Sequence, residues 1–159
     1  MKKFLRKTPV MITFIALAVV MLVVYIGMLV RPVAIGMTYK GKIEGVETSV
    51  KVKNGSEVVI KVDDTEMEGR YVVKGREVYF QAGDMSDKEY KELKEDVLEN
   101  WEEAKEYGLI SDTNAFAVEF GDENLTCAGS IVFAAVGGVV TVALVTFATL
   151  SLVYFIKKK

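Results

Sequence analysis

Two long stretches without a charged residue constrain the fold of this chain more than any other feature. Residues 10–30 are 21 uncharged, mostly apolar residues, and residues 129–156 are 28 such residues. A helix rises about 1.5 Å per residue and the hydrocarbon core of a bilayer is about 30 Å thick. The first stretch just crosses that core, and the second must tilt or reach the headgroups. We therefore predict two transmembrane helices around one central domain, residues 31–128.

A secretory signal peptide is the alternative for residues 10–30, because basic residues precede the stretch. The apolar run is longer than the usual core of a signal peptide. Arg31-Pro32 follows it, where small residues would mark a cleavage site. These two features favour an uncleaved anchor.

Basic residues flank both stretches at the ends of the chain. Residues 1–9 include Lys2, Lys3, Arg6 and Lys7, residues 157–159 are lysines, and all 22 acidic residues lie in the central domain. Because positive residues stay on the cytoplasmic side, we expect a multi-pass protein of a bacterial cell membrane with both tails in the cytoplasm. The central domain then lies outside, with 13 basic and 22 acidic residues and a net charge of -9. Such a domain repels nucleic acid.

The central domain begins with apolar residues that alternate with polar ones, as in half-buried strands. We expect turns at Asn54-Gly55, where both residues tolerate a positive φ, at residues 63–65 and at Gly75. Five strands joined by short turns predict an antiparallel β-meander. Its inward-facing residues are Met37, Tyr39, Gly41, Ile43, Val50, Val52, Val58, Ile60, Val62, Met67, Gly69, Tyr71, Val73, Val78 and Phe80.

An amphipathic helix follows the five strands. Ser86 and Glu89 form the pattern of a capping box, and Gly108 is a natural stop. We expect the apolar stripe of this helix to cover the inward face of the meander, and residues 114–120 to add a final strand. The predicted fold class is α+β. The stripe consists of Tyr90, Leu93, Val97, Trp101 and Ala104.

Residues 68–80, EGRYVVKGREVYF, contain a Gly-x-Tyr-x-Val strand, a turn at Gly75 and a strand that ends in an aromatic residue. With the preceding Asn-Gly hairpin, residues 37–81 resemble bacterial lipocalin-like domains. The resemblance covers about a quarter of the chain. It implies a small barrel or half-barrel at the cell surface. Five strands before the helix are too few for a closed eight-stranded barrel.

Few residues of this chain fit an enzyme or a metal site. It has no histidine and one cysteine, Cys127, which excludes histidine-based triads and clusters of cysteine ligands. Residues 64–69 match the start of a calcium loop, but the twelfth position is Gly75 instead of glutamate. Cys127 could link two copies or carry a lipid, and a small half-buried residue is the favoured interpretation. We expect no enzyme activity, no cofactor and no metal.

Small residues recur at four-residue spacing in the second apolar stretch, where Ala134 precedes Gly138 and Gly137 precedes Thr141. This spacing lets helix backbones approach closely. We favour packing against the first apolar stretch. Homo-oligomer formation through this helix, or docking into a larger membrane complex, is the alternative.

Two functions fit these features. The first is a non-enzymatic accessory or interaction protein whose outer domain recognises a protein or an envelope component. The second is a lipocalin-like binder of a small apolar ligand at the cell surface, and a carboxylate enzyme ranks last. An apolar cavity between sheet and helix would favour the second function, and a filled core with an exposed apolar patch would favour the first.

Overall fold

The chain is described by a computed structural model that covers residues 8–107 and 110–157. It divides into two compact units. One unit holds α2 (Thr8–Leu29) and α5 (Ala128–Ile156) from Val132 onward, and the other is Val30–Ile131. Gly108 and the basic residues Lys2, Lys3, Arg6, Lys7, Lys158 and Lys159 of the predicted tails lie outside the described residues.

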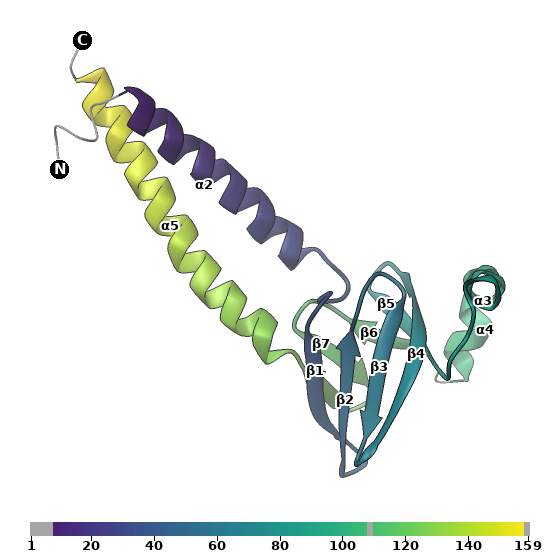
Figure 1. The fold of residues 1–159 in the computed structure, drawn as a ribbon. Helices are drawn as coiled ribbons and strands as arrows, with labels where there is room; N and C mark the ends of the chain where they lie inside the picture. Colours follow the sequence, from purple (N-terminus) through teal and green to yellow (C-terminus); the bar gives the residue numbers. More distant parts are fainter. Residues whose placement is uncertain (1–7, 108–109, 158–159) are drawn as a thin grey trace. The chain divides into compact units, whose positions relative to one another are not determined.

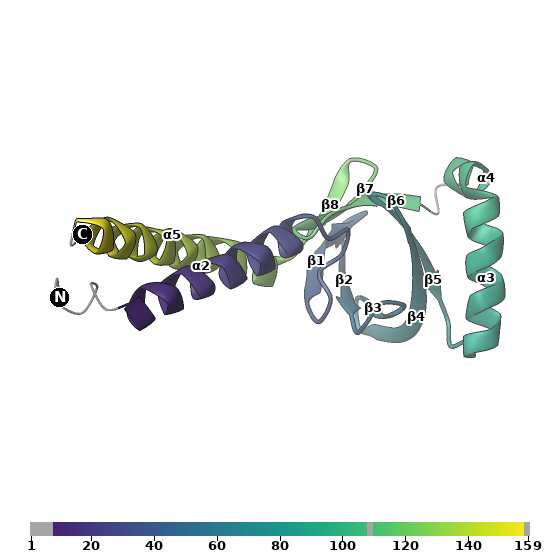
Figure 2. The same ribbon diagram turned by 90° about the horizontal axis from the view of Figure 1, so that it is seen from above.

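Eight antiparallel strands form a closed barrel, in which each strand pairs with the next along the chain (Figures 1 and 2). β8 returns to β1, where Thr126 pairs with Lys40. Such an up-and-down barrel has no free strand edge. Its strands are β1 (Thr38–Ile43), β2 (Val46–Val52), β3 (Glu57–Val62), β4 (Thr65–Lys74), β5 (Glu77–Ala82), β6 (Ile110–Thr113), β7 (Ala117–Phe120) and β8 (Glu123–Thr126).

The predicted meander is confirmed as β1 to β5, but the expectation of too few strands for a closed barrel is wrong. Three strands of four residues each follow the helix and complete the barrel. The expected final strand over residues 114–120 is shorter, because Asn114 forms a turn. Its Oδ1 atom accepts hydrogen bonds from the amides of Phe116 at 2.8 Å and Ala117 at 2.9 Å. The sequence thus predicted β7 but neither β6 nor β8.

The hairpin at Asn54-Gly55 forms, but by a different mechanism from the expected one. Neither residue has a positive φ. Instead, Asn54 Oδ1 accepts hydrogen bonds from the amides of Ser56 and Glu57, each at 2.9 Å. The two-residue turn with positive φ lies at Glu44 and Gly45, where φ is 51° and 81°. These are the turn angles that Asn-Gly was expected to supply.

The barrel interior is an apolar core built from predicted inward-facing residues of β1 to β5 together with Val118 of β7 and Leu125 of β8. The side chains of Tyr39, Val52, Val78, Val118 and Leu125 have no exposed surface. Burial of this kind contributes about 25 cal/mol per Å² of apolar surface and is the main source of stability in a small domain. The alternation along β1 to β5 therefore predicts the core correctly.

One end of the barrel is closed by the chain segment that precedes β1. The Tyr39 hydroxyl accepts a hydrogen bond from the Ala34 amide at 2.7 Å and donates one to the Asn114 carbonyl at 2.8 Å. Thr113 Oγ1 donates to the Pro32 carbonyl at 2.9 Å. Burial raises the pKa of Tyr39 to about 12, so this phenol stays neutral in its packed position. The Gly36 amide also donates to the Val52 carbonyl at 2.8 Å, so the segment forms a plug that is hydrogen-bonded to β1, β2 and β6.

Two short helices lie on the outside of the barrel, and the predicted capping box is confirmed at the start of α3 (Asp87–Glu99). α4 (Trp101–Glu106) continues after a break at Asn100. The expectation that the stripe covers the inward face is wrong. Val97 and Trp101 pack against Val72 and Tyr79, which point outward from β4 and β5. Figure 2 shows the two helices outside these strands. Because the closed barrel leaves no room for a helix on the inward face of the strands, α3 and α4 cover the apolar patch of Val72 and Tyr79 on the outer face.

Polar contacts fix the helices to the barrel at both ends. Near the start of α3, Arg70 forms ion pairs with Asp87 at 3.0 Å and with Glu57 at 3.3 Å. At the other end, Trp101 Nε1 donates to a Glu77 carboxylate oxygen at 2.8 Å, and Lys105 pairs with the other oxygen. The helices are therefore a fixed outer layer.

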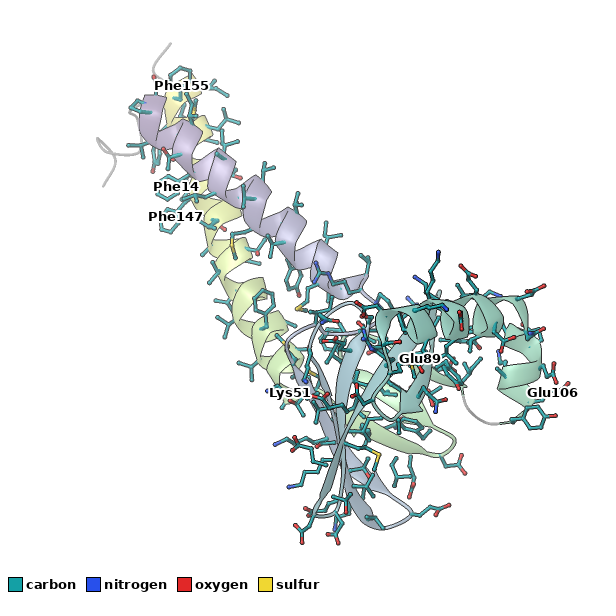
Figure 3. The ribbon with its side chains drawn as sticks, turned by 45° about the vertical axis from the view of Figure 1, so that its right-hand side comes forward. Phe14, Lys51, Glu89, Glu106, Phe147 and Phe155 are labelled. Atoms are coloured by element: carbon teal, nitrogen blue, oxygen red, sulfur yellow. The ribbon has the colours of Figure 1, made fainter. Side chains whose placement is uncertain are left out.

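The two long helices are each long and apolar enough to cross a membrane. Phe14 of α2 stacks on Phe147 of α5 with 5.5 Å between ring centroids (Figure 3). The less exposed residues recur at alternating spacings of three and four, as in a coiled coil. They include Met11, Phe14, Ala18, Met21, Tyr25 and Met28 on α2, and Ala134, Gly137, Thr141, Leu144, Ala148 and Ser151 on α5.

Candidate binding site at the open end of the barrel

The end of the barrel opposite the plug is open. β1, β3, β5 and β7 run toward it, so the turns after these strands form its rim. Figure 1 shows the turns after β1 and β3 at this lower end of the barrel. The rim consists of residues 44–45, 63–64, 83–86 and 121–122.

An apolar cavity of about 350 Å³ lies inside this open end. Val46 and Val62 are 40% and 38% exposed, so the cavity is open to solvent. Pockets that bind small molecules have volumes of about 300–1,000 Å³ and are mostly apolar. The cavity is lined by Ile43, Glu44, Val46, Thr48, Val50, Ile60, Val62, Phe80 and Phe120.

Aromatic rings form the inner part of the barrel below this cavity. The Phe80 ring lies 6.3 Å from the Phe120 ring and 6.3 Å from the Tyr71 ring, measured between centroids. The Tyr71 hydroxyl donates a hydrogen bond to the Asn54 carbonyl at 2.6 Å, at the closed end. Burial raises the pKa of Tyr71 to about 12, so the ring system carries no charge. The cavity is therefore a cup with an apolar floor and not a channel.

The rim of the cup is acidic. Its turns contain Glu44, Asp63, Asp64, Asp84 and Asp122, and no lysine or arginine. The Glu44 amide donates a hydrogen bond to a carboxylate oxygen of Glu123 at 2.6 Å, which ties the first turn to β8.

A second hollow, of about 420 Å³, lies on the outer wall of β1, β2 and β3. Lys40, Lys42 and Lys61 border it, together with Glu47 and Asp63. The three lysines and Glu47 point outward by the strand alternation, Asp63 lies in the turn after β3, and the hollow has no wall of apolar side chains. It is a charged outer surface, whereas the cup offers an apolar interior.

Two of the four predicted helix-packing residues, Gly137 and Gly138, lie next to Tyr25 of α2. A Cβ atom added at Gly137 would lie 3.5 Å from Cδ2 of Tyr25, and one at Gly138 would lie 3.5 Å from the Tyr25 hydroxyl. Thr141 is buried and donates to the Gly137 carbonyl at 2.7 Å, and Ala134 is half-buried. A Cβ atom at either glycine would thus make ordinary van der Waals contact with Tyr25, and only a larger side chain would displace the ring.

Among residues 8–107 and 110–157, no group of three acidic, histidine or cysteine residues could hold a metal ion. Residues 64–69, the expected start of a calcium loop, form the β3–β4 turn and the first part of β4. Cys127 is completely buried and lies 3.2 Å from the Ser130 hydroxyl. Its sulfur is therefore not exposed for a bond to a second copy or to a lipid.

Sequence reasoning found most residues of the cup but not the site itself. Alternation gave the inward direction of Ile43, Ile60, Val62 and Phe80. The turn at Glu44-Gly45 was missed, although a glycine between two alternating segments is a recognised turn signal.

No protein family model, curated protein or solved structure matches this chain. The eight-stranded antiparallel barrel agrees with the geometry that the lipocalin-like resemblance of residues 37–81 implies. The functional interpretation of the cup therefore depends on its geometry and chemistry.

Proposed function

We propose that this chain is a non-enzymatic binding protein of the cell membrane. In this proposal α2 and α5 cross the bilayer, both tails are cytoplasmic and the barrel lies outside the cytoplasm. The open end of the barrel binds a small apolar ligand. The observation that carries the binding function is the apolar cup of about 350 Å³.

The membrane part of the proposal is supported by the surfaces of the two helices. Large apolar side chains point away from the helix pair, among them Val23, which is 64% exposed, and Val139, which is 72% exposed. Contiguous exposed apolar surface of this extent is destabilising in water but suits lipid. The lysines and arginines at the two chain ends support a cytoplasmic position for both tails.

The binding part is supported by the position and lining of the cup. An apolar cavity between the sheet and the helix would have favoured ligand binding, but that interface is filled by Val72, Tyr79, Val97 and Trp101. The open end instead has a concave apolar surface, which favours the ligand-binding function over that of an accessory protein. Recognition of a protein or envelope partner stays a prediction.

Protease protection in whole cells tests the membrane part. Trypsin added outside should cleave the central domain at exposed lysines such as Lys88 and spare an epitope tag at either terminus. Tags that are digested in intact cells, or release of the protein by a salt wash, would contradict it.

Methyl-resolved NMR of the full chain in phosphatidylcholine nanodiscs tests the binding part. We expect 1-octanol to shift the methyl signals of Ile43, Ile60 and Val62 in a saturable manner. Thr48→Phe should abolish these shifts, because Thr48 lines the cup and a phenyl ring fills it. Ser49→Phe is the matched control, because it adds the same ring on the outer wall of the same strand. Equal shifts in both variants would contradict binding in the cup.

Self-association through α5 remains a prediction of the sequence. The small residues Gly137 and Gly138 lie against Tyr25 of the same chain. A second copy would therefore have to use another face of α5 or displace α2. Crosslinking of the intact protein in its membrane measures whether either occurs.

A further inference from the structure

We infer that the natural ligand of the cup is an amphiphilic cation, a small molecule with a short apolar part and a positively charged head. This inference rests on the proposed binding of an apolar ligand at the open end. It adds the charge of the ligand, which the rim of the cup determines.

The rim has a single sign of charge. Four carboxylates lie in the turns after β1, β3 and β7: Glu44, Asp63, Asp64 and Asp122. Asp84, in the turn after β5, instead borders an outer hollow together with Lys53 and Arg70. Glu44 also lines the cavity itself. A ligand whose apolar part enters the cup must leave its polar head among these groups. A cationic head is attracted there, whereas an anionic head is repelled.

Lysines near the opening do not reverse this charge. Lys42 and Lys61 lie two residues from Glu44 and Asp63 on β1 and β3, and they border the hollow on the outer wall. By the strand alternation they point away from the cup, and two acidic residues, Glu47 and Asp63, border the same hollow. The carboxylates therefore set the charge at the turns after β1, β3 and β7, whereas the Arg70 guanidinium, which donates to the Met85 carbonyl at 3.2 Å, lies next to the turn after β5.

The opposite end of the barrel carries the opposite charge. Its loops are residues 31–37, 53–56, 75–76 and 114–116, which contain Arg31, Lys53 and Arg76 and no acidic residue. The loops at the two ends thus differ in the sign of their charge, although Lys53 is paired with Glu68 on β4 at 2.6 Å. The positive groups lie at the plugged end, where they cannot pair with the head of a ligand in the cup.

The size of the cup limits the apolar part. Its volume of about 350 Å³ is near the lower end of the range for small-molecule sites. Because the aromatic rings of Phe80 and Phe120 close the floor, a long chain cannot pass through the barrel. A single short alkyl chain or one small ring system fits this shape.

Three probes with the same alkyl chain test the charge preference: octyltrimethylammonium, 1-octanol and octanoate. Each is titrated into the full chain in phosphatidylcholine nanodiscs, and the methyl signals of Ile43, Ile60 and Val62 report occupancy of the cup. At low salt we expect the Kd of the cation to be about tenfold lower than that of the anion, which corresponds to about 1.4 kcal/mol. The difference should nearly vanish in 1 M salt, where the Debye length falls to about 3 Å.

A rim variant tests which residues set the preference. Glu44→Asn, Asp63→Asn and Asp122→Asn together remove three charges, and asparagine tolerates the positive φ at Glu44 and Asp63. The matched control removes three exposed carboxylates on the outer helices, through Glu99→Gln, Glu102→Gln and Glu103→Gln. We expect the rim variant to lose the preference for the cation and the control to keep it.

The outcomes separate this inference from the proposed function. Equal affinity for the three probes would overturn the inference and leave the apolar binding function intact. If the rim variant and the control variant lose the preference for the cation equally, the inference is likewise overturned and the apolar binding function is left intact. If no probe shifts the methyl signals, both proposals are wrong. If those signals shift with protein concentration in the absence of a probe, a second copy occupies the cup, and the inference is also wrong.

Discussion

Replacement of Gly41 by alanine tests the closure of the barrel. A Cβ atom at this position would lie 2.4 Å from the Asn124 carbonyl oxygen and 3.1 Å from Cδ2 of Leu125. Ordinary contacts begin at 3.4 Å, so β8 would have to move by about 1 Å. β1 and β8 are paired only at Lys40 and Thr126, so this seam has few hydrogen bonds with which to resist the shift.

We expect Gly41→Ala to destabilise the barrel by about 2 kcal/mol, the usual cost of overpacking a filled core. For a domain of this size the unfolding temperature falls by about 10 °C. Near-UV circular dichroism of the buried tyrosines, with the chain in nanodiscs, measures the transition. Hydrogen exchange of the β1 and β8 amides should accelerate more than that of β3 and β4.

Gly55→Ala is the matched control for this experiment. Gly55 has no positive φ, and a Cβ atom there would have no neighbour within 4 Å. We expect a change within about 0.5 kcal/mol. If the two variants unfold at the same temperature and exchange equally along β1, then β8 does not close on β1.

Three further predictions concern the plug and the outer helices. Tyr39→Phe removes the partner of the Ala34 amide and of the Asn114 carbonyl, so denaturant unfolding should show a loss of about 1–3 kcal/mol; no loss would mean that the plug is not ordered. Hydrogen bonds from Lys105 and Trp101 lower the pKa of Glu77. The Glu77 carboxylate therefore contributes to the stability of the folded barrel above the unfolded pKa of 4.5. This stability is lost as the pH falls through the lower pKa that Glu77 has in the folded state. Trp101 fluorescence should report this loss in the wild type and a weaker pH dependence in Glu77→Gln; equal profiles would exclude this role. Arg70→Gln removes the ion pair with Asp87 and should speed hydrogen exchange in the first turn of α3 by about threefold, whereas unchanged exchange would show that the apolar stripe alone holds the helix.

Sequence reasoning succeeded where the pattern is local and long enough. The strands β1 to β5 have six to ten residues, and their alternation gave the inward direction of Tyr39, Val58 and Tyr71. The capping box at Ser86 and Glu89 also depends only on neighbouring residues, and it forms as predicted. The lack of charge over residues 10–30 predicted a long apolar helix for the same reason.

The remaining features depend on contacts between distant residues. β8 pairs with β1 across 86 positions, and no local pattern reports this closure. Val72 and Tyr79 alternate outward, and the sequence left open whether they meet water, a partner or a second layer. Once the interior is closed and filled, the helix stripe can bury its apolar side chains only on this outer patch. The acidic rim likewise arises from four turns that meet only when the barrel forms.

The central claim is that the open end of the barrel is a binding site, and photolabelling in the native membrane tests it most directly. A short alkylamine with a diazirine at its far end is added to membranes that contain the full chain, irradiated, and mapped by mass spectrometry. We predict labels within residues 43–50, 60–62 and 120, and their loss in Thr48→Phe but not in Ser49→Phe. Labels confined to α2 and α5, with none in the barrel, would contradict the claim.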